Sequence, residues 1–148
     1  MAGQIGLGRV LNTIPIAAGA GFTMRGASSA TFVCTGNDTF TLTVASSFGG
    51  SYGTPQTTAI GGGMIHEYAT NSATNGTAAW ANTVLAYGSY VNAVTIASGT
   101  VVFTVFTSQF ADPNCYLKCS VGASGLVTVV THDLTVQRSP ENLQILGA

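Results

Sequence analysis

The chain has 148 residues, which suits one domain that buries roughly two-thirds of the surface its unfolded form would expose. Only 6% of the residues are charged and the net charge is -1, against about 25% charged residues in ordinary soluble domains. Four Lys and Arg residues cannot form a nucleic-acid groove or a polybasic membrane surface. With 46% hydrophobic residues, the chain has little charge repulsion to keep its copies apart.

Residues 1–22 are rich in Gly, Ala and Ile and show no strand alternation, so we expect an N-terminal arm before a β domain at 23–137. The apolar stretch that contains Ile14 and Ile16 is interrupted by Pro15 and is too short for the apolar core of a signal peptide. The sequence also has no apolar run of about 18 residues. We therefore expect no signal peptide, no membrane span and synthesis in the cytoplasm.

The first clear strand is predicted at Thr39–Val44, where apolar and polar residues alternate and place Phe40, Leu42 and Val44 on a covered face. Weaker patterns with β-branched and aromatic residues also indicate strands. These further candidates are Ala30–Thr35, Met64–Thr70, Val84–Tyr90 and Ala93–Ala97.

The second half contains stronger patterns. Val101–Phe106 has apolar residues on both faces, which is typical of a central strand. Cys115–Val121 and Leu126–Thr131 each alternate, and the Gly122–Gly125 loop between them predicts an antiparallel hairpin. Thr77–Ala81 could begin a short helix, but no apolar helical period runs far enough for a long one.

This pattern of short strands and Gly-rich turns predicts a mainly β, single-domain antiparallel β-sandwich or barrel with extended N- and C-terminal arms. The C-terminal tail, 138–148, ends in the apolar residues Leu143, Ile145 and Leu146. Because a free monomer gains nothing by exposing them, they either fold back or dock on a neighbour, and we favour docking. The candidate interface residues are Ile14, Ile16, Leu143, Ile145 and Leu146.

No catalytic residues are predicted. The pair His66-Glu67 lacks the second histidine of a metalloprotease helix, because position 70 is Thr70. His132 and Asp133 are neighbours, and neighbours in a strand point to opposite faces, so Asp133 cannot easily orient the imidazole of His132. The chain has no Gly-x-Ser-x-Gly motif and no phosphate-binding loop. We therefore expect a protein that is not an enzyme and has no cofactor.

Carboxylates and thiols do not form a metal site in this prediction. Asp38 and Asp112 are interpreted as turn formers. Cys115 and Cys119 would share one strand face about 13 Å apart, which is too far for one metal ion. We expect Cys34, Cys115 and Cys119 to be reduced, to bind no metal and to act as small buried residues.

Two segments carry a resemblance. Thr35–Phe48 resembles the early β segment, and Gly125–Leu143 the closing strand and tail, of small virion proteins from phages of actinobacteria. The second segment holds the run His-Asp-Leu-Thr-Val-Gln-Arg at 132–138, followed by Pro140, and the segment around Trp80 is similar more loosely. The resemblance implies a structural protein of a tailed-phage capsid, with capsid decoration as its role. Its implied partners are the major capsid protein and copies of itself, as a homo-oligomer for which a trimer is one option.

Two other functions stay open. A tail-tube or connector subunit would form rings with a charged lumen, and the scarcity of charge argues against it. A carbohydrate-binding β-sandwich would stack sugars on aromatic residues, for which the candidates are Trp80, Tyr52, Tyr87 and Tyr90. An enzyme is a fourth and weaker reading, because the sequence offers no active site.

Overall fold

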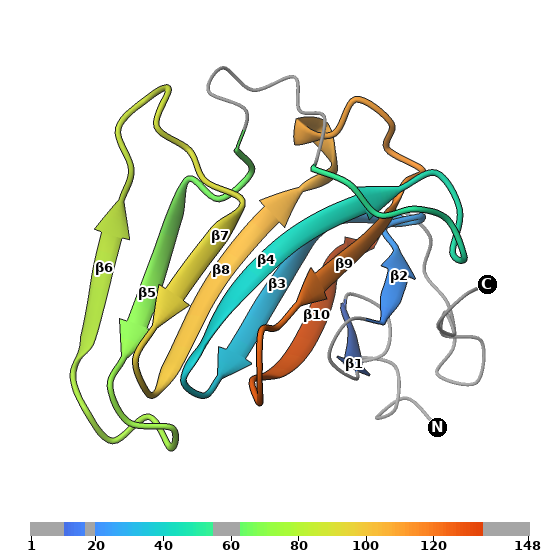
Figure 1. The fold of residues 1–148 in the computed structure, drawn as a ribbon. Coiled ribbons are helices and arrows are strands. Elements are labelled where there is room, and N and C mark those ends of the chain that lie inside the picture. The colour runs from blue at the N-terminus through green and yellow to red at the C-terminus, as the bar shows by residue number, and fades with distance from the viewer. Residues whose placement is uncertain (1–10, 17–19, 55–62, 135–148) are drawn as a thin grey trace, which may run out of the picture.

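The computed structural model describes residues 11–16, 20–54 and 63–134, which form two antiparallel sheets (Figure 1). One sheet has six strands in the order β1-β10-β3-β8-β5-β6, and the other has four in the order β2-β9-β4-β7. In chain order the strands are β1 (Leu11–Ile16), β2 (Gly21–Thr23), β3 (Ala27–Thr35), β4 (Asp38–Ala45), β5 (Glu67–Asn71), β6 (Trp80–Val84), β7 (Ala93–Ile96), β8 (Thr100–Phe106), β9 (Tyr116–Ser120) and β10 (Leu126–Leu134). The predicted mainly β sandwich is confirmed.

The core lies between the two sheets and is rich in aromatic residues. Phe32 of β3 stacks on Phe103 of β8 with ring centroids 5.1 Å apart, and Phe22 of β2 packs on Phe32 at 5.9 Å. Leu42 of β4 and Leu117 of β9 are fully buried from the opposite sheet. Strands of both sheets thus contribute apolar residues to one shared interior.

The clearest strand predictions are confirmed. In β4, Phe40 and Leu42 are fully buried and Val44 packs against the core, as the alternation predicted. β8 lies between β3 and β5, inside the six-stranded sheet, as its apolar residues on both faces indicated. In and beside β9, Cys115, Leu117 and Cys119 form a buried row. Periodicity therefore identified the strands and their covered faces.

The predicted hairpin between the strands at 115–121 and 126–131 is wrong. β9 pairs with β2 and β4, whereas β10 pairs with β1 and β3 in the other sheet. Both segments are strands, but residues 121–125 cross from one sheet to the other. Alternation shows that a strand buries one face, but it does not show which strand lies beside it.

The crossing at 121–125 is held by the carboxylate of Asp38. Its Oδ1 accepts hydrogen bonds from the backbone N–H groups of Thr39 (2.8 Å) and Gly122 (2.7 Å), and its Oδ2 from those of Ala123 (2.9 Å) and Gly125 (2.9 Å). These bonds, led by Ala123 and Gly125, lower the pKa of Asp38 to about 2. Asp38 is therefore more than a local turn former, because it fixes β4 to the connection between two strands from opposite sheets.

The N-terminal segment differs from the arm expected at 1–22. Within it, β1 pairs along its length with β10, and β2, which begins at its last two residues, pairs with β9. β1 contains Pro15, which is compatible with an edge strand because such a strand leaves one side of its backbone unpaired. The six-stranded sheet thus begins inside the predicted arm, while the predicted tail at 138–148 lies outside the described residues.

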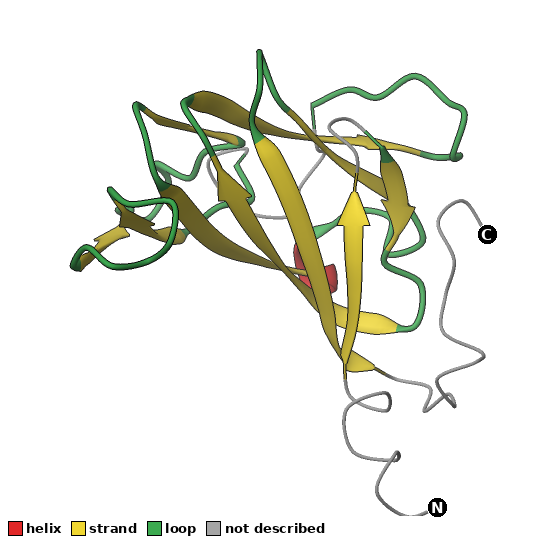
Figure 2. Cartoon of the chain, turned by 90° about the horizontal axis from the view of Figure 1, so that it is seen from below, coloured by secondary structure: helices red, strands yellow, loops and turns green. Residues whose placement is uncertain are grey.

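Two weaker predictions also need correction. The helix suggested at Thr77–Ala81 is absent, because Trp80 and Ala81 begin β6. The strand predicted at Val84–Tyr90 overlaps β6 only at Val84. Figure 2 shows strands dominating the described residues, with the short 3₁₀ helix η2 (Thr107–Gln109) following β8. Within the described ranges, no helix is long and apolar enough to cross a membrane.

Candidate functional site

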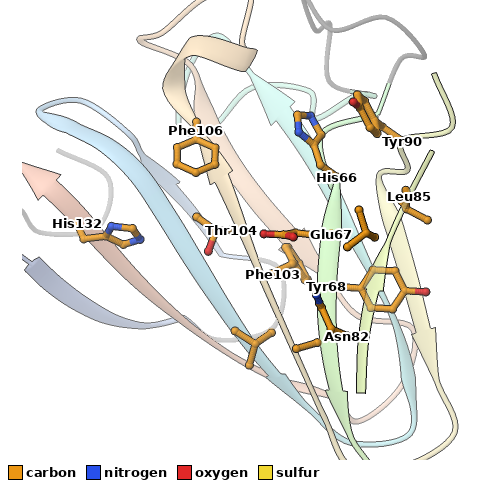
Figure 3. Close-up of a pocket in the computed structure, with 13 residues that line it drawn as sticks. His66, Glu67, Tyr68, Asn82, Leu85, Tyr90, Phe103, Thr104, Phe106 and His132 are labelled. Atoms are coloured by element: carbon orange, nitrogen blue, oxygen red, sulfur yellow. The ribbon is translucent and has the colours of Figure 1, made fainter. Parts of the chain in front are cut away.

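The outer face of the six-stranded sheet carries a groove of about 620 Å³ over β8, β5 and β6. The alternation in β8 explains its floor: Val101 and Val105 face the core, while Val102, Thr104 and Phe106 face outward. Figure 3 shows the residues that line it. These are His66, Glu67, Tyr68, Ala69, Asn82, Val84, Leu85, Tyr90, Val102, Phe103, Thr104, Phe106 and His132.

Large apolar side chains are exposed in and around this groove. Phe106 at the end of β8 is 47% exposed and Val84 at the end of β6 is 70% exposed. Trp80, at the opposite end of β6, is 51% exposed, and Tyr87 in the following turn is 73% exposed. Such a concentration on one region of a small domain is typical of a surface that contacts another molecule.

One end of the groove is fixed by the side chain of Gln109, which follows β8. Its Nε2 donates to the carbonyl of Met64 at 3.0 Å and lies 2.6 Å from His66 Nε2, which accepts. Its Oε1 accepts from the backbone N–H of Phe106 at 2.6 Å. The His66 ring also stacks on Tyr90 with centroids 3.9 Å apart, as Figure 3 shows. His66 is therefore held as part of a rigid wall.

The other end of the groove is fixed by hydroxyl groups around His132 of β10. Ser29 Oγ lies 2.8 Å from His132 Nδ1, and Thr31 Oγ1 lies 2.9 Å from His132 Nε2. Thr31 Oγ1 is also 2.8 Å from Thr104 Oγ1 of β8. This network joins β10, β3 and β8 across the sheet. Because Ser29 is completely buried, its hydroxyl cannot reach a substrate as a nucleophile would.

Polar groups occupy the middle of the groove. Glu67, the charged residue among the described lining, extends from β5 toward Thr104 in Figure 3. Asn82 of β6 lies opposite Ala69 on the neighbouring strand. Both Glu67 and Asn82 are exposed, so they remain accessible to a binding partner. The surface thus combines aromatic and aliphatic walls with a carboxylate and an amide.

The described residues contain no group of three or more His, Cys, Asp or Glu that could hold a metal ion. Cys34 of β3 and Cys119 of β9 meet across the core from opposite sheets, and a hydrogen bond with Cys119 is the largest cause of a raised pKa at Cys34. Burial raises the pKa of Cys115 to about 11. The sequence suggested Cys115 and Cys119 as the pair to consider, because they share one strand face. The contact that forms is instead between Cys34 and Cys119, which belong to different sheets.

The structure describes two of the five interface residues predicted from the sequence. Ile14 and Ile16 lie in β1, where their backbones pair with Val129 and Val127 of β10. The tail residues Leu143, Ile145 and Leu146 lie outside the described residues. Nothing in the described part of the chain brings the two sets together.

The aromatic candidates separate into different regions. Tyr87 and Tyr90 contact each other edge to face at 6.2 Å beside the groove, with Trp80 at the far end of β6. Tyr52 lies with the other sheet, where Lys118 of β9 sits over its ring. The sequence did not predict the groove itself. Its only available signal was the uncharged run through 80–90, whose outward residues cannot be distinguished from core residues without the strand pairing.

Comparison of the chain with protein-family models, with curated proteins and with solved structures gives no match.

Proposed function

We propose that this protein is a non-enzymatic structural subunit of a tailed-phage virion, a capsid decoration protein that binds the major capsid protein on the outer shell. The observation that carries the proposal is the gathering of Val84, Tyr87, Tyr90 and Phe106 around one groove in a chain with nine charged residues. An apolar surface of this kind favours protein contacts, and low net charge favours dense packing of copies. The resemblance of two segments to actinobacterial phage virion proteins supports the location.

The architecture suits this role. A sandwich with the hydrogen-bonded walls built by Gln109 and His132 offers a rigid surface, and rigidity reduces the entropy lost on binding. A decoration protein also binds at many equivalent sites on one shell, so modest affinity per copy gives high occupancy when neighbouring copies touch. Neither property requires a catalytic residue.

The test uses emptied shells of the phage that encodes this chain, stripped of the protein and mixed with purified full-length chain. Co-sedimentation should show saturable binding, and electron cryomicroscopy should show added density at regular outer positions. Phe106→Ser should reduce occupancy, because it removes an apolar wall of the groove. The matched control is Leu126→Ser, since Leu126 is 71% exposed but does not line the groove.

Three results would count against the proposal: no binding of the wild-type chain to shells, binding only to tails or connectors, or equal loss of binding with both serine variants. The thermal melting of each variant shows whether reduced binding comes from unfolding.

A second candidate, a carbohydrate-binding module, is favoured by one observation. The stacked His66 and Tyr90 and the exposed Tyr87 stand beside the carboxylate of Glu67 and the amide of Asn82. Aromatic faces and such polar groups are the chemistry that binds neutral sugars. Titration calorimetry with neutral oligosaccharides tests it: binding that Tyr90→Ala abolishes would support this function, and absence of binding across a glycan array would reject it.

A further inference from the structure

Strand β6 forms an uncovered edge of the six-stranded sheet. It pairs with β5 on one side, and no described strand lies on its other side, as Figure 1 shows. Four of its five residues are exposed, and these include residues on both faces of the strand. β6 therefore projects beyond the core, with its free edge accessible from both sides.

The hydrogen-bond alternation shows which groups this edge presents. The backbone N–H of Leu85 donates to the carbonyl of His66 at 2.9 Å, so this is a hydrogen-bonded pair of the β5–β6 ladder. Bonded and non-bonded pairs alternate along antiparallel strands. Ala81 and Thr83 therefore direct their N–H and C=O groups to β5, while Trp80, Asn82 and Val84 direct theirs to the free edge.

The free edge lacks the features that keep edge strands apart in monomers. Those features are charges, proline, bulges or very short length. β1, at the other edge of the same sheet, contains Pro15, and β2 and β7 have three and four residues. β6 reads Trp-Ala-Asn-Thr-Val, with five residues, no charge and no proline. Among the described edges, it is the one best suited to pair with another strand.

We propose that β6 pairs antiparallel with β6 of a second copy of this chain, about a two-fold axis at Asn82. In this register Asn82 faces Asn82 of the other copy, and Trp80 faces Val84 on both sides of the axis. Trp80, Asn82 and Val84, whose backbone groups point to the free edge, then each lie opposite one of the same three residues of the other copy. This register pairs the N–H and C=O groups that the edge presents. The two six-stranded sheets become continuous across the dimer.

The sequence of β6 favours a second copy over another protein. The strand is self-complementary, because the Asn82 side chains of the two copies face each other. The indole of Trp80 in each copy faces the aliphatic side chain of Val84 in the other. Aromatic–aliphatic pairs stabilise facing strands, and the absence of charge removes any like-charge repulsion about the axis. This pairing goes beyond the proposed function, because it applies to the isolated protein whether or not it binds shells.

The test measures self-association of the full-length chain by sedimentation velocity over a range of concentrations. The wild type should form a dimer in reversible equilibrium with monomer. Trp80→Lys combined with Val84→Lys places like charges opposite each other twice and should weaken dimerisation by about tenfold or more. Trp80→Lys combined with Val84→Glu should retain the dimer, with an affinity that falls as salt is added.

Two further variants separate pairing from folding. Asn82→Pro removes an N–H that points away from β5, so it should abolish the dimer while the far-ultraviolet circular dichroism, which reports the strands, stays unchanged. Leu126→Lys adds a charge at an equally exposed apolar position away from β6 and should leave the dimer intact.

A wild type that stays monomeric overturns the inference, as does a dimer that survives the double-lysine variant. Loss of the dimer in both double variants rejects the antiparallel register. Each of these outcomes leaves shell binding to be judged by its own assay, so failure here and failure of the decoration function are distinguishable.

Discussion

Asp38 shows how one side chain can connect two sheets. Its carboxylate satisfies the backbone N–H groups of Gly122, Ala123 and Gly125 in the crossing at 121–125, and that of Thr39 in its own strand. Each bond to an ionised acceptor is stronger than one between neutral groups. The negative charge is therefore part of the fold in a chain that has few charges.

Replacing Asp38 should destabilise the protein and change its response to acid. Asp38→Ala should lower the melting temperature clearly, because it leaves backbone donors without an acceptor. Asp112→Ala is the control, since that carboxylate accepts one backbone bond in an exposed turn, and it should have a smaller effect. A melting temperature of Asp38→Ala equal to that of the control would contradict this role.

The acid dependence follows from the lowered pKa of Asp38. The native state holds this pKa at about 2, against an ordinary 3.8, so the unfolded state binds the proton more readily. The stability that the ionised group contributes is complete above about pH 4 and is lost as pH falls toward 2. Denaturation of the wild type at several pH values should show this loss, and Asp38→Asn should flatten it.

The cysteines should be unreactive in the native protein. Cys34 and Cys119 are fully buried, and the raised pKa of Cys115, about 11 against an ordinary 9.0, lowers its thiolate fraction about 100-fold near neutral pH. A chromogenic disulfide reagent should therefore label the native protein slowly and all three thiols at once in denaturant. Rapid labelling of the native form would show that the core opens readily.

At the scale of elements, the turn between β7 and β8 controls how closely β5 approaches. Gly99 has a φ of +97°, and a Cβ there would clash with the backbone carbonyl of Asn71 at the end of β5. The position therefore needs glycine for two reasons, its backbone conformation and the space around it. Gly88 has a similar φ of +85° but open space around it.

The pair of glycines allows a controlled prediction. Gly88→Ala should cost about 1–2 kcal/mol for the left-handed backbone alone. Gly99→Ala should lower the free energy of unfolding by more, on the order of 4 kcal/mol, because β5 must also move. Denaturant titration measures both values. Equal losses of unfolding free energy in the two variants would mean that β5 moves away from the new side chain without destabilising the protein.

The positions of the strands were easier to predict from this sequence than the pairing of each strand with its neighbours in the sheet. The alternation in β4 and the apolar run of β8 are local patterns, so Phe40 and Leu42 could be assigned to a covered face and Val101–Phe106 to a central strand. The partner of β9 could not, because a glycine-containing loop fits both a hairpin and a crossing between sheets. The carboxylate that holds the crossing belongs to Asp38, which lies 84 to 87 residues away from the groups that it binds.

The candidate site was less predictable for the same reason. His66, Phe106 and His132 are far apart in the sequence and line the same groove only because β5, β8, β3 and β10 lie side by side. Phe106 and Val84 look like core residues in the sequence, since exposure depends on which face a neighbouring strand covers. Sequence patterns therefore predicted the strands that carry the groove better than they predicted the groove itself.

At the scale of the whole molecule, the tail can be tested separately from the sandwich. Removing residues 141–148 deletes Leu143, Ile145 and Leu146, and we expect the shortened chain to melt near the wild-type temperature while binding shells more weakly. Burying these three side chains on a partner would contribute about 1.5–3 kcal/mol each before the entropy of ordering the tail is subtracted.

The control removes only residues 147–148 and keeps all three apolar side chains. Circular dichroism checks the fold of both shortened chains, and co-sedimentation with shells measures their attachment. Wild-type occupancy by the chain lacking 141–148 would reject the tail as a docking element.

The position of β10 has a consequence for how the protein is made. β10 is the last described strand in the sequence, yet it lies between β1 and β3 and is the partner through which β1 joins the sheet. About 90 residues separate the end of β3 from the start of β10. At about 5–20 residues per second, a ribosome needs roughly 5–20 s to add them. During that interval the growing chain carries an unpaired edge on β3, so synthesis of many copies at once should favour chaperones that shield nascent strands.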